Sequence, residues 1–369
     1  MYKRTKLAVL AGVAIAGISL WGCGGTSRQT ATSRAAASPE LVLAATIDQR
    51  SFAPAELQNA PGQVVQYWAP VYDTLLVRTR EGGVEGNAAE AFAYNDDQTQ
   101  LTLTLRDGLK YADGSEVTAS SVAQGLELFK NGTATDANLY ANIEISAPDD
   151  QHLVFNLAEV DPGFVYRLAS SSGAVFNPAG FDAPDIATNP NAAASGAYTL
   201  DTQSTVAGDQ YVYVRNANYW NPDAYPYDKL TIKVMTDATA RVNALTTGQI
   251  EVAMIEALAI PEVGSKGKVV TIHSAAWEGV YIYDRDGELV PALKDPRVRQ
   301  AMNMAFDREA IAKTLFLDTV QPTSQIFGES SPGHVDGAEY EYDPAAAKEL
   351  LGEAGYADGF DLVVPTIPG

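Results

Sequence analysis

The side chains that most often carry catalysis or bind metals are scarce in this chain and widely spaced. The 369 residues include one cysteine, Cys23, and three histidines, His152, His273 and His334. A single cysteine excludes an internal disulfide and a cysteine-based metal cluster. The sequence also has no Gly-x-Ser-x-Gly elbow, no His-Glu-x-x-His helix and no phosphate-binding loop. We therefore expect a protein that is not an enzyme and that needs no cofactor and no metal.

Two short stretches imitate phosphate- or ion-binding loops. Gly264–Lys268 (GSKGK) is rich in glycine and lysine but lacks the spacing of a phosphate loop. Asp284–Gly287 (DRDG) is similar to the start of a calcium loop, but the later oxygen ligands are absent. We interpret the first stretch as a charged turn and the second as a hairpin turn.

Length and charge set the class of protein. At about 150 residues per domain, 369 residues predict two or three domains. The chain has 46 acidic and 25 basic residues and a formal net charge of −21. Such a surface repels nucleic-acid phosphates and anionic membrane faces. We expect no nucleic-acid partner.

The N-terminus has the pattern of an export signal. Lys3, Arg4 and Lys6 precede the apolar run Leu7–Leu20, which is shorter than the roughly 20 residues of a membrane-spanning helix. The chain's one cysteine, Cys23, follows at the break, where the sequence resembles a bacterial lipoprotein box. We expect residues 1–22 to be a signal peptide, Cys23 to be acylated, and residues 23–39 to form a flexible tether. The alternative is an ordinary signal peptide with an incidental cysteine.

The stretch from Trp277 to Leu317 predicts a strand followed by two helices. Trp277, Gly279, Tyr281 and Tyr283 alternate along the chain, so a strand would place them on one face. Asp286-Gly287 predicts a turn. Asp295-Pro296 predicts the start of a helix, because aspartate caps free N–H groups and proline fits the first helical position. Asp307 predicts the cap of a second helix over Arg308–Leu317.

Several motifs carry a family resemblance. They are Arg297–Ala301 (RVRQA) with Asp307–Ile311 (DREAI), the paired Asp-Gly turns of Arg106–Gly114, and Gln210–Trp220 (QYVYVRNANYW). Together they resemble the extracytoplasmic solute-binding proteins of peptide/nickel-type ABC importers, solute-binding family 5. Strands that alternate with helices point to the same α/β class.

The resemblance implies an α/β, periplasmic-binding-protein-like fold with two lobes, of the type II, large peptide-binding subclass. Residues 40–80 and 190–276 would form the core of lobe I and residues 81–189 a subdomain of it. Residues 277–369 would start lobe II. Family members continue past the point that corresponds to Gly369, so we expect a truncated chain with an incomplete second lobe.

The resemblance also implies ligand-contacting residues. In the family, the loop that matches Asn59–Gly62 lines the ligand cleft, and Gly62 permits close backbone approach. Tyr140 and Ser172 lie near other family contacts. In the segment that crosses between lobes, we expect Trp277 and Tyr281 to contact ligand and Glu278 to meet a ligand cation. The alternatives are an ordinary surface loop for Asn59–Gly62 and packing at the lobe junction for the last three residues.

The function that follows is a substrate-binding lipoprotein of an ABC transporter. It would be a monomer outside the cytoplasm, held at the membrane only by its lipid. It would capture a peptide or a similar small solute and dock on permease subunits. The alternatives are a nickel-chelate, haem or oligosaccharide binder of the same family, a secreted hydrolase, and a surface adhesin.

Overall fold

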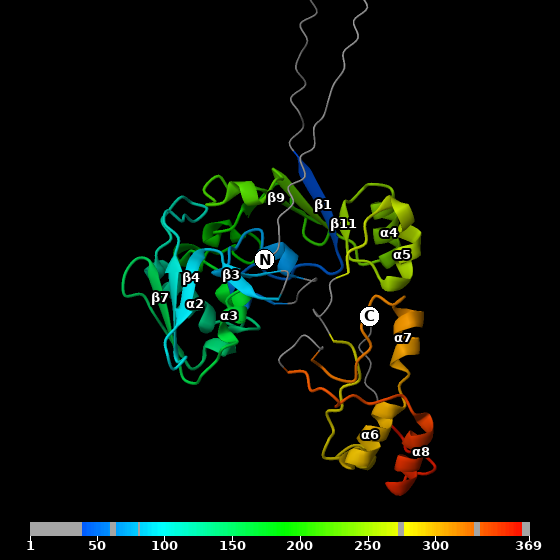
Figure 1. Ribbon diagram of the computed structural model, residues 1–369. Coiled ribbons are helices and arrows are strands. Elements are labelled where there is room, and N and C mark those ends of the chain that lie inside the picture. The colour runs from blue at the N-terminus through cyan, green and yellow to red at the C-terminus, as the bar shows by residue number, and fades with distance from the viewer. Residues whose placement is uncertain (1–38, 60–63, 80–81, 272–276, 328–332, 364–369) are drawn as a thin grey trace, which may run out of the picture. The chain divides into compact units, whose positions relative to one another are not determined.

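The computed structural model describes residues 39–59, 64–79, 82–271, 277–327 and 333–363 (Figure 1). Its largest sheet has the strand order β11-β1-β10-β9-β8. β1 runs parallel to both β10 and β11, while β9 is antiparallel to β10 and to β8. The strands of this sheet are β1 Glu40–Ala45, β8 Tyr198–Leu200, β9 Gln210–Arg215, β10 Lys229–Val234 and β11 Val252–Ala253.

A crossover connection that contains a helix joins β10 to β11, and both of these strands run parallel to β1. After β10, Asp237 caps α4 (Ala238–Thr246) by accepting a hydrogen bond from the Ala240 N–H at 2.7 Å. The chain then turns at Gly248, whose φ of +73° favours glycine, and enters β11. Ala44, Ala244 and Ile250 pack together in this unit. Parallel pairing needs such a helical connection, because a tight turn reverses the chain.

A second sheet has the order β4-β5-β7-β6 and is antiparallel throughout. In β5 and β7 every second residue is buried, which is the period of a strand with one face on a core. A small pair, β2 with β3, precedes this sheet. The bounds are β2 Leu76–Arg78, β3 Val84–Gly86, β4 Ala89–Tyr94, β5 Gln100–Leu105, β6 Ile143–Ser146 and β7 His152–Leu157.

Aromatic side chains fill the core between the second sheet and α2 (Ala119–Lys130). Thr118 and Ser121 form a reciprocal capping box that starts α2. Phe129 of α2 stacks on Phe176 with ring centroids 5.9 Å apart. Tyr140 meets Phe164 edge to face at 5.9 Å. The other helices in the described residues are α1 Val65–Trp68, α3 Phe164–Arg167, α4 as above, α5 Ile260–Val263, α6 Pro296–Met304, α7 Arg308–Leu315 and α8 Pro344–Glu353, with short 3-10 helices between them.

Residues 282–360 build a separate apolar cluster on α6 and α8. Its buried members are Val290, Ala292, Leu293 and Val298, with Leu351 among the half-buried side chains around them. The two helix starts predicted from the sequence in this region are confirmed. Asp295 caps α6 with Pro296 at its first turn, and Asp307 caps α7. α7 ends at Leu315 rather than Leu317, since Leu317 and Asp318 adopt positive φ angles of 50° and 59°.

The predicted strand over Trp277–Tyr283 is wrong. None of these residues is in a strand, and Tyr283 is 89% exposed. Alternation along a sequence makes a strand only where a neighbouring strand pairs with it, and no described residue pairs with this segment. The turn at Asp286-Gly287 is present, with a φ of +69° at Gly287. The division of the chain into lobes stays a prediction.

Candidate functional site

The loop that follows β1, residues 46–59, is fixed from behind by buried aromatic side chains of α1 and the turn after it. Three aromatic residues, Tyr67, Trp68 and Tyr72, each donate a hydrogen bond to a carbonyl oxygen of the loop. The loop backbone is therefore held at three points along its length. Tyr67 Oη donates to Ile47 O at 2.7 Å, Tyr72 Oη to Phe52 O at 2.8 Å, and Trp68 Nε1 to Gln58 O at 3.0 Å. Burial raises the pKa of Tyr67 and of Tyr72, so both phenols stay protonated donors.

A second loop lies directly beside the first. Thr133 N donates to Ala55 O at 2.6 Å, and Thr135 N donates to Leu57 O at 3.2 Å. A side chain at Gly132 would lie 2.5 Å from the Ala55 carbonyl oxygen, so glycine is required for this approach. The two loops therefore form one surface, although about 75 residues separate them in the sequence.

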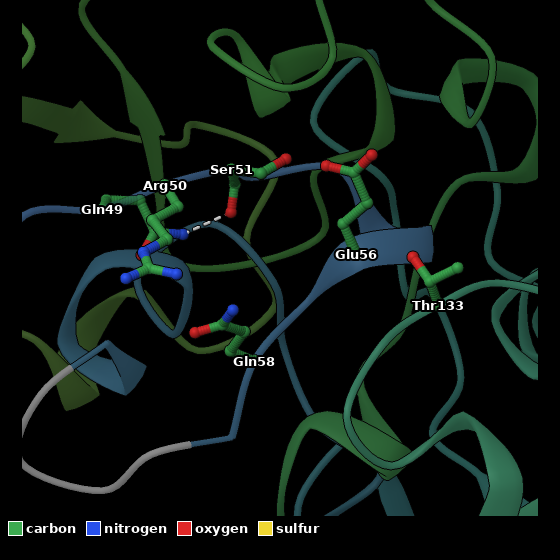
Figure 2. Close-up of a pocket in the computed structure, with 6 residues that line it drawn as sticks. All are labelled: Gln49, Arg50, Ser51, Glu56, Gln58 and Thr133. Carbon is green, nitrogen blue, oxygen red and sulfur yellow. Dashed lines mark hydrogen bonds between the residues drawn. The ribbon is translucent and has the colours of Figure 1, made fainter.

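A polar pocket of about 310 Å³ opens on this surface (Figure 2). It has one cationic and one anionic side chain in its lining, Arg50 and Glu56. Gln49 Nε2 donates to Ser51 O at 2.5 Å and orders one wall. The lining residues are Gln49, Arg50, Ser51, Glu56, Gln58 and Thr133. Arg50 also lines a neighbouring pocket of about 350 Å³.

Asn59, a predicted ligand contact, ends the first loop and belongs to a hydrogen-bonded cluster. Asn59 Nδ2 donates to Asp136 Oδ2 at 2.9 Å, and Ser171 Oγ donates to the same oxygen at 2.9 Å. The side chains of Asn59 and Asp136 are each half-buried. No described residue donates to Asp136 Oδ1. This carboxylate can therefore accept a hydrogen bond from an N–H or ammonium group that approaches from solvent.

Tyr140 and Ser172 contact each other directly beneath this cluster. Tyr140 is fully buried and its hydroxyl donates to the Ser172 carbonyl oxygen. The Ser172 hydroxyl is also buried, and no described residue supplies it with a hydrogen-bond partner. A buried unpaired hydroxyl is costly. The structure thus brings Tyr140 and Ser172 together with Asn59 through the adjacent Ser171, in a supporting layer rather than at the surface.

Trp277 and Tyr281 lie edge to face with ring centroids 4.9 Å apart, and Tyr281 stacks on Tyr283 at 6.0 Å. Gly279 lies under the Trp277 ring, where a larger residue would collide with the indole. Tyr281 is 55% exposed and Glu278 is also exposed. These residues present an aromatic surface to solvent. Gly62 and Cys23, the other predicted residues, lie outside the described residues.

A buried acid that sequence reasoning missed lies at Asp73. Its carboxylate accepts hydrogen bonds from Trp220 Nε1 at 2.9 Å, from Asn87 Nδ2 at 2.6 Å and from the Thr74 N–H at 3.0 Å. Burial raises the pKa of Asp73 to about 6, even though these donors favour the charged form. Arg106 lies 4.5 Å above the Trp220 ring as a cation–π contact. No local motif marks this network, because its members come from four separate segments, and Trp220 is 147 residues from Asp73.

In the part of the chain that the structure describes, no group of three or more His, Cys, Asp or Glu side chains could hold a metal ion. Among the described helices, none combines the length and apolar character that crossing a bilayer requires.

A match to a protein-family model shows which family this chain belongs to. The model of bacterial extracellular solute-binding proteins, family 5, middle region, matches residues 83–368. The chain belongs to solute-binding family 5. Family 5 is described as a family of solute-binding proteins and as extracellular, which agrees with the class that the sequence motifs predicted.

Family 5 relatives with curated descriptions include the glutathione-binding protein GsiB of Salmonella typhi. It is 27% identical over 346 residues, which cover 92% of this chain and 66% of the relative. GsiB of Escherichia coli strain K12 is 27% identical over 299 residues, covering 79% of this chain and 57% of the relative. The chain thus spans somewhat less than two thirds of the length of these relatives.

Solved structures show the same fold. The murein tripeptide binding protein MppA of Escherichia coli has a TM-score of 0.68 at 22% identity, covering 87% of this chain and 67% of that one. DppA of Helicobacter pylori, in complex with the peptide STSA, has a TM-score of 0.69 at 21% identity, covering 87% and 67%. The predicted periplasmic-binding-protein-like α/β fold is confirmed.

Proposed function

We propose that this family 5 chain is the solute-capturing component of an ABC importer and works outside the cytoplasm. It binds a peptide or a similar small solute, does no chemistry on it, and delivers it to a membrane permease. Membership of family 5 supports this proposal, since relatives are named for binding glutathione and a murein tripeptide. A further neighbour, NikA of Brucella suis, is described in complex with Fe(III)-EDTA, so ligand chemistry varies between relatives.

The observation that carries the proposal is the surface made by the two adjacent loops. Asn59 and Asp136 sit on it, and buried aromatic donors fix the backbone beneath it. A site whose supporting backbone is already ordered loses little conformational entropy when ligand binds. We assign Asn59 and Gly62 as ligand contacts, with Tyr140 and Ser172 as the buried support of this surface.

Capture requires a second surface that closes on the ligand. We propose residues 40–80 and 190–276 as the core of lobe I, residues 81–189 as its subdomain, and residues 277–369 as part of lobe II. Trp277, Glu278 and Tyr281, at the crossing between lobes, contact the ligand in the closed state. A ligand shifts an open–closed equilibrium only by binding the closed state better, so contacts from both lobes are needed.

We also propose that the protein is a monomer held at the membrane by a lipid on Cys23. The support for the lipid is in the sequence alone: a basic start, an apolar run of export-signal length, and the chain's single cysteine at the break. A lipid anchor of this kind keeps a soluble receptor near its permease without a membrane-spanning helix.

The test is isothermal titration calorimetry of the purified protein with trialanine. We expect a saturable complex, and we expect Asp136→Ala to weaken it by about tenfold or more, because the variant removes the acceptor that orders Asn59. Asp182→Asn removes an exposed carboxylate outside the cluster and should leave binding unchanged. A wild-type protein that binds neither trialanine nor glutathione contradicts the proposed function.

A further inference from the structure

The loop between β9 and β10, Asn221–Asp228 (NPDAYPYD), presents an aromatic surface to solvent. Its exposed uncharged residues are Pro222, Ala224, Tyr225 and Pro226. Tyr225 is 43% exposed, and its ring meets the buried rings of Tyr198 and Tyr219 edge to face, with centroids 6.1 and 5.8 Å apart. The loop therefore displays one side of an aromatic cluster whose other side is packed into the fold.

This loop is held in one conformation by Arg215, the last residue of β9. Its Nη1 donates to Pro222 O at 3.0 Å, its Nη2 to Tyr225 O at 2.6 Å, and its Nε to the Asp228 carboxylate at 2.7 Å. Tyr198 Oη also donates to Tyr227 O at 2.8 Å. Because the backbone is already ordered, a surface that binds Tyr225 pays little conformational entropy for the contact.

The charges around the loop are mostly neutralised, although the chain as a whole has a net charge of −21. Asp228 is paired with Arg215, and Glu40, at the start of β1, is paired with Lys229 at 3.1 Å. Asp223 is the other acid of the loop. This end of the sheet is therefore repelled less by lipid phosphates than the acidic surface elsewhere.

The loop lies where the predicted tether joins the folded chain. Pro39, the first described residue, accepts hydrogen bonds from Asp228 N at 2.8 Å and from Lys229 N at 3.4 Å. Residues 24–38, which follow Cys23, number 15. As the flexible tether that their composition predicts, they would span roughly 20 Å on average. A lipid on Cys23 would thus keep this loop close to the bilayer.

We propose that Asn221–Asp228 lies against the surface of the bilayer that holds Cys23, with Tyr225 among the lipid headgroups. This inference rests on the proposed lipid anchor and adds a second contact to it. A tyrosine suits the membrane–water interface, because its ring is apolar and its hydroxyl is polar. At a tethered effective concentration on the order of 1 mM, a contact with a dissociation constant of about 1 mM is occupied about half of the time. The contact turns the opposite end of the sheet away from the membrane.

Val206 provides a matched control position at that opposite end. β9 pairs antiparallel with β10, Gln210 with Lys233 and Val214 with Lys229, so β9 begins beside the last residues of β10. Val206 is joined to Gln210 there, N–H to carbonyl oxygen at 2.8 Å, and is 53% exposed. The full length of a strand therefore separates Val206 from the loop.

The experiment places a fluorescent probe on the lipid-anchored protein, reconstituted in phosphatidylcholine vesicles that contain nitroxide-labelled lipids. Acylated Cys23 has no free thiol, so Ala224→Cys and Val206→Cys each give a single labelling site. We expect blue-shifted emission and quenching by the nitroxide lipids at position 224 and neither at position 206. Adding Tyr225→Ser to Ala224→Cys should remove most of the quenching, whereas adding Val206→Ser should leave it unchanged.

Equal quenching at positions 224 and 206, or full quenching with Tyr225→Ser, overturns the contact and leaves the anchor and solute capture standing. A blue-shifted probe at position 224 that nitroxide lipids do not quench also overturns it, because a second copy or a permease would then cover the loop. An intact mass without lipid on Cys23 overturns the anchor and this inference together. Tyr225→Ser should bind trialanine as the wild type does, so the capture function is tested separately.

Discussion

The buried carboxyl of Asp73 predicts how the stability of the protein depends on pH. Its pKa rises from 3.8 to about 6 on folding, with burial as the main cause. The folded protein therefore holds this proton more tightly than the unfolded chain does. The resulting stabilisation is fully present below about pH 4 and is lost as the pH rises through 6.

The size of the effect follows from the two pKa values. Each pKa unit corresponds to about 1.4 kcal/mol, so a rise from 3.8 to about 6 changes the free energy of unfolding by up to about 3 kcal/mol. Asp73→Asn keeps the shape of the side chain and removes the titration. With its amide oxygen toward Asn87, the variant places an NH2 donor where Trp220 Nε1 needs an acceptor, so it loses a hydrogen bond that the ionised carboxylate makes, which costs about 1 kcal/mol.

The assay is urea unfolding of the wild type and Asp73→Asn between pH 4 and pH 8, followed by circular dichroism. The free energy of unfolding of the wild type relative to the variant should fall by up to about 3 kcal/mol across this range. Asp182→Asn, an exposed carboxyl, should show no such trend. A difference that stays constant with pH, or that grows as the pH rises, refutes the reasoning. The latter would mean that Trp220 and Asn87 stabilise the ionised carboxylate more than burial destabilises it.

Three further predictions concern the anchor, a helix cap and a close backbone contact. A fatty-acid probe should label the wild type in cells but not Cys23→Ala, and equal labelling of both contradicts the anchor. Thr118→Ala should lower the free energy of unfolding in urea by about 1 kcal/mol, because it breaks the capping box of α2; Ser120→Ala, exposed in the same helix, should not, and equal effects would contradict the capping role. Gly173→Ala should cost at least about 3 kcal/mol or prevent folding, since a methyl group there would collide with the Leu168 carbonyl oxygen. Gly352→Ala, with its nearest neighbour 3.9 Å away, should instead stabilise α8 by up to about 1 kcal/mol; destabilisation of a similar size in both glycine variants would contradict this reasoning.

Local chemistry explains what the sequence could predict. Asp295, Asp307 and Thr118 start helices through contacts with residues two or three positions ahead, so the signal lies within one turn of chain. The segment from Trp277 to Tyr283 has strand alternation, yet it forms no strand because pairing depends on distant residues.

The candidate site shows the same limit. The family resemblance points to Asn59. Its partner Asp136, and Ser171, which also bonds to Asp136, come from loops that only the fold brings together. Asp73 and Trp220 are 147 residues apart, and a burial-driven pKa cannot be predicted without knowing what covers the carboxyl. Arg50 and Glu56 had no sequence signal, because neither belongs to a motif and only the fold places both in the lining of one pocket.

Native mass spectrometry of the protein, purified without denaturation from its source and then mixed with trialanine or glutathione, tests the capture of a small solute most directly. We predict a complex whose mass exceeds that of the protein by the mass of one small solute per chain. The solute should dissociate when the protein is denatured. The bare protein mass alone, before and after an excess of either peptide is added, would contradict the account.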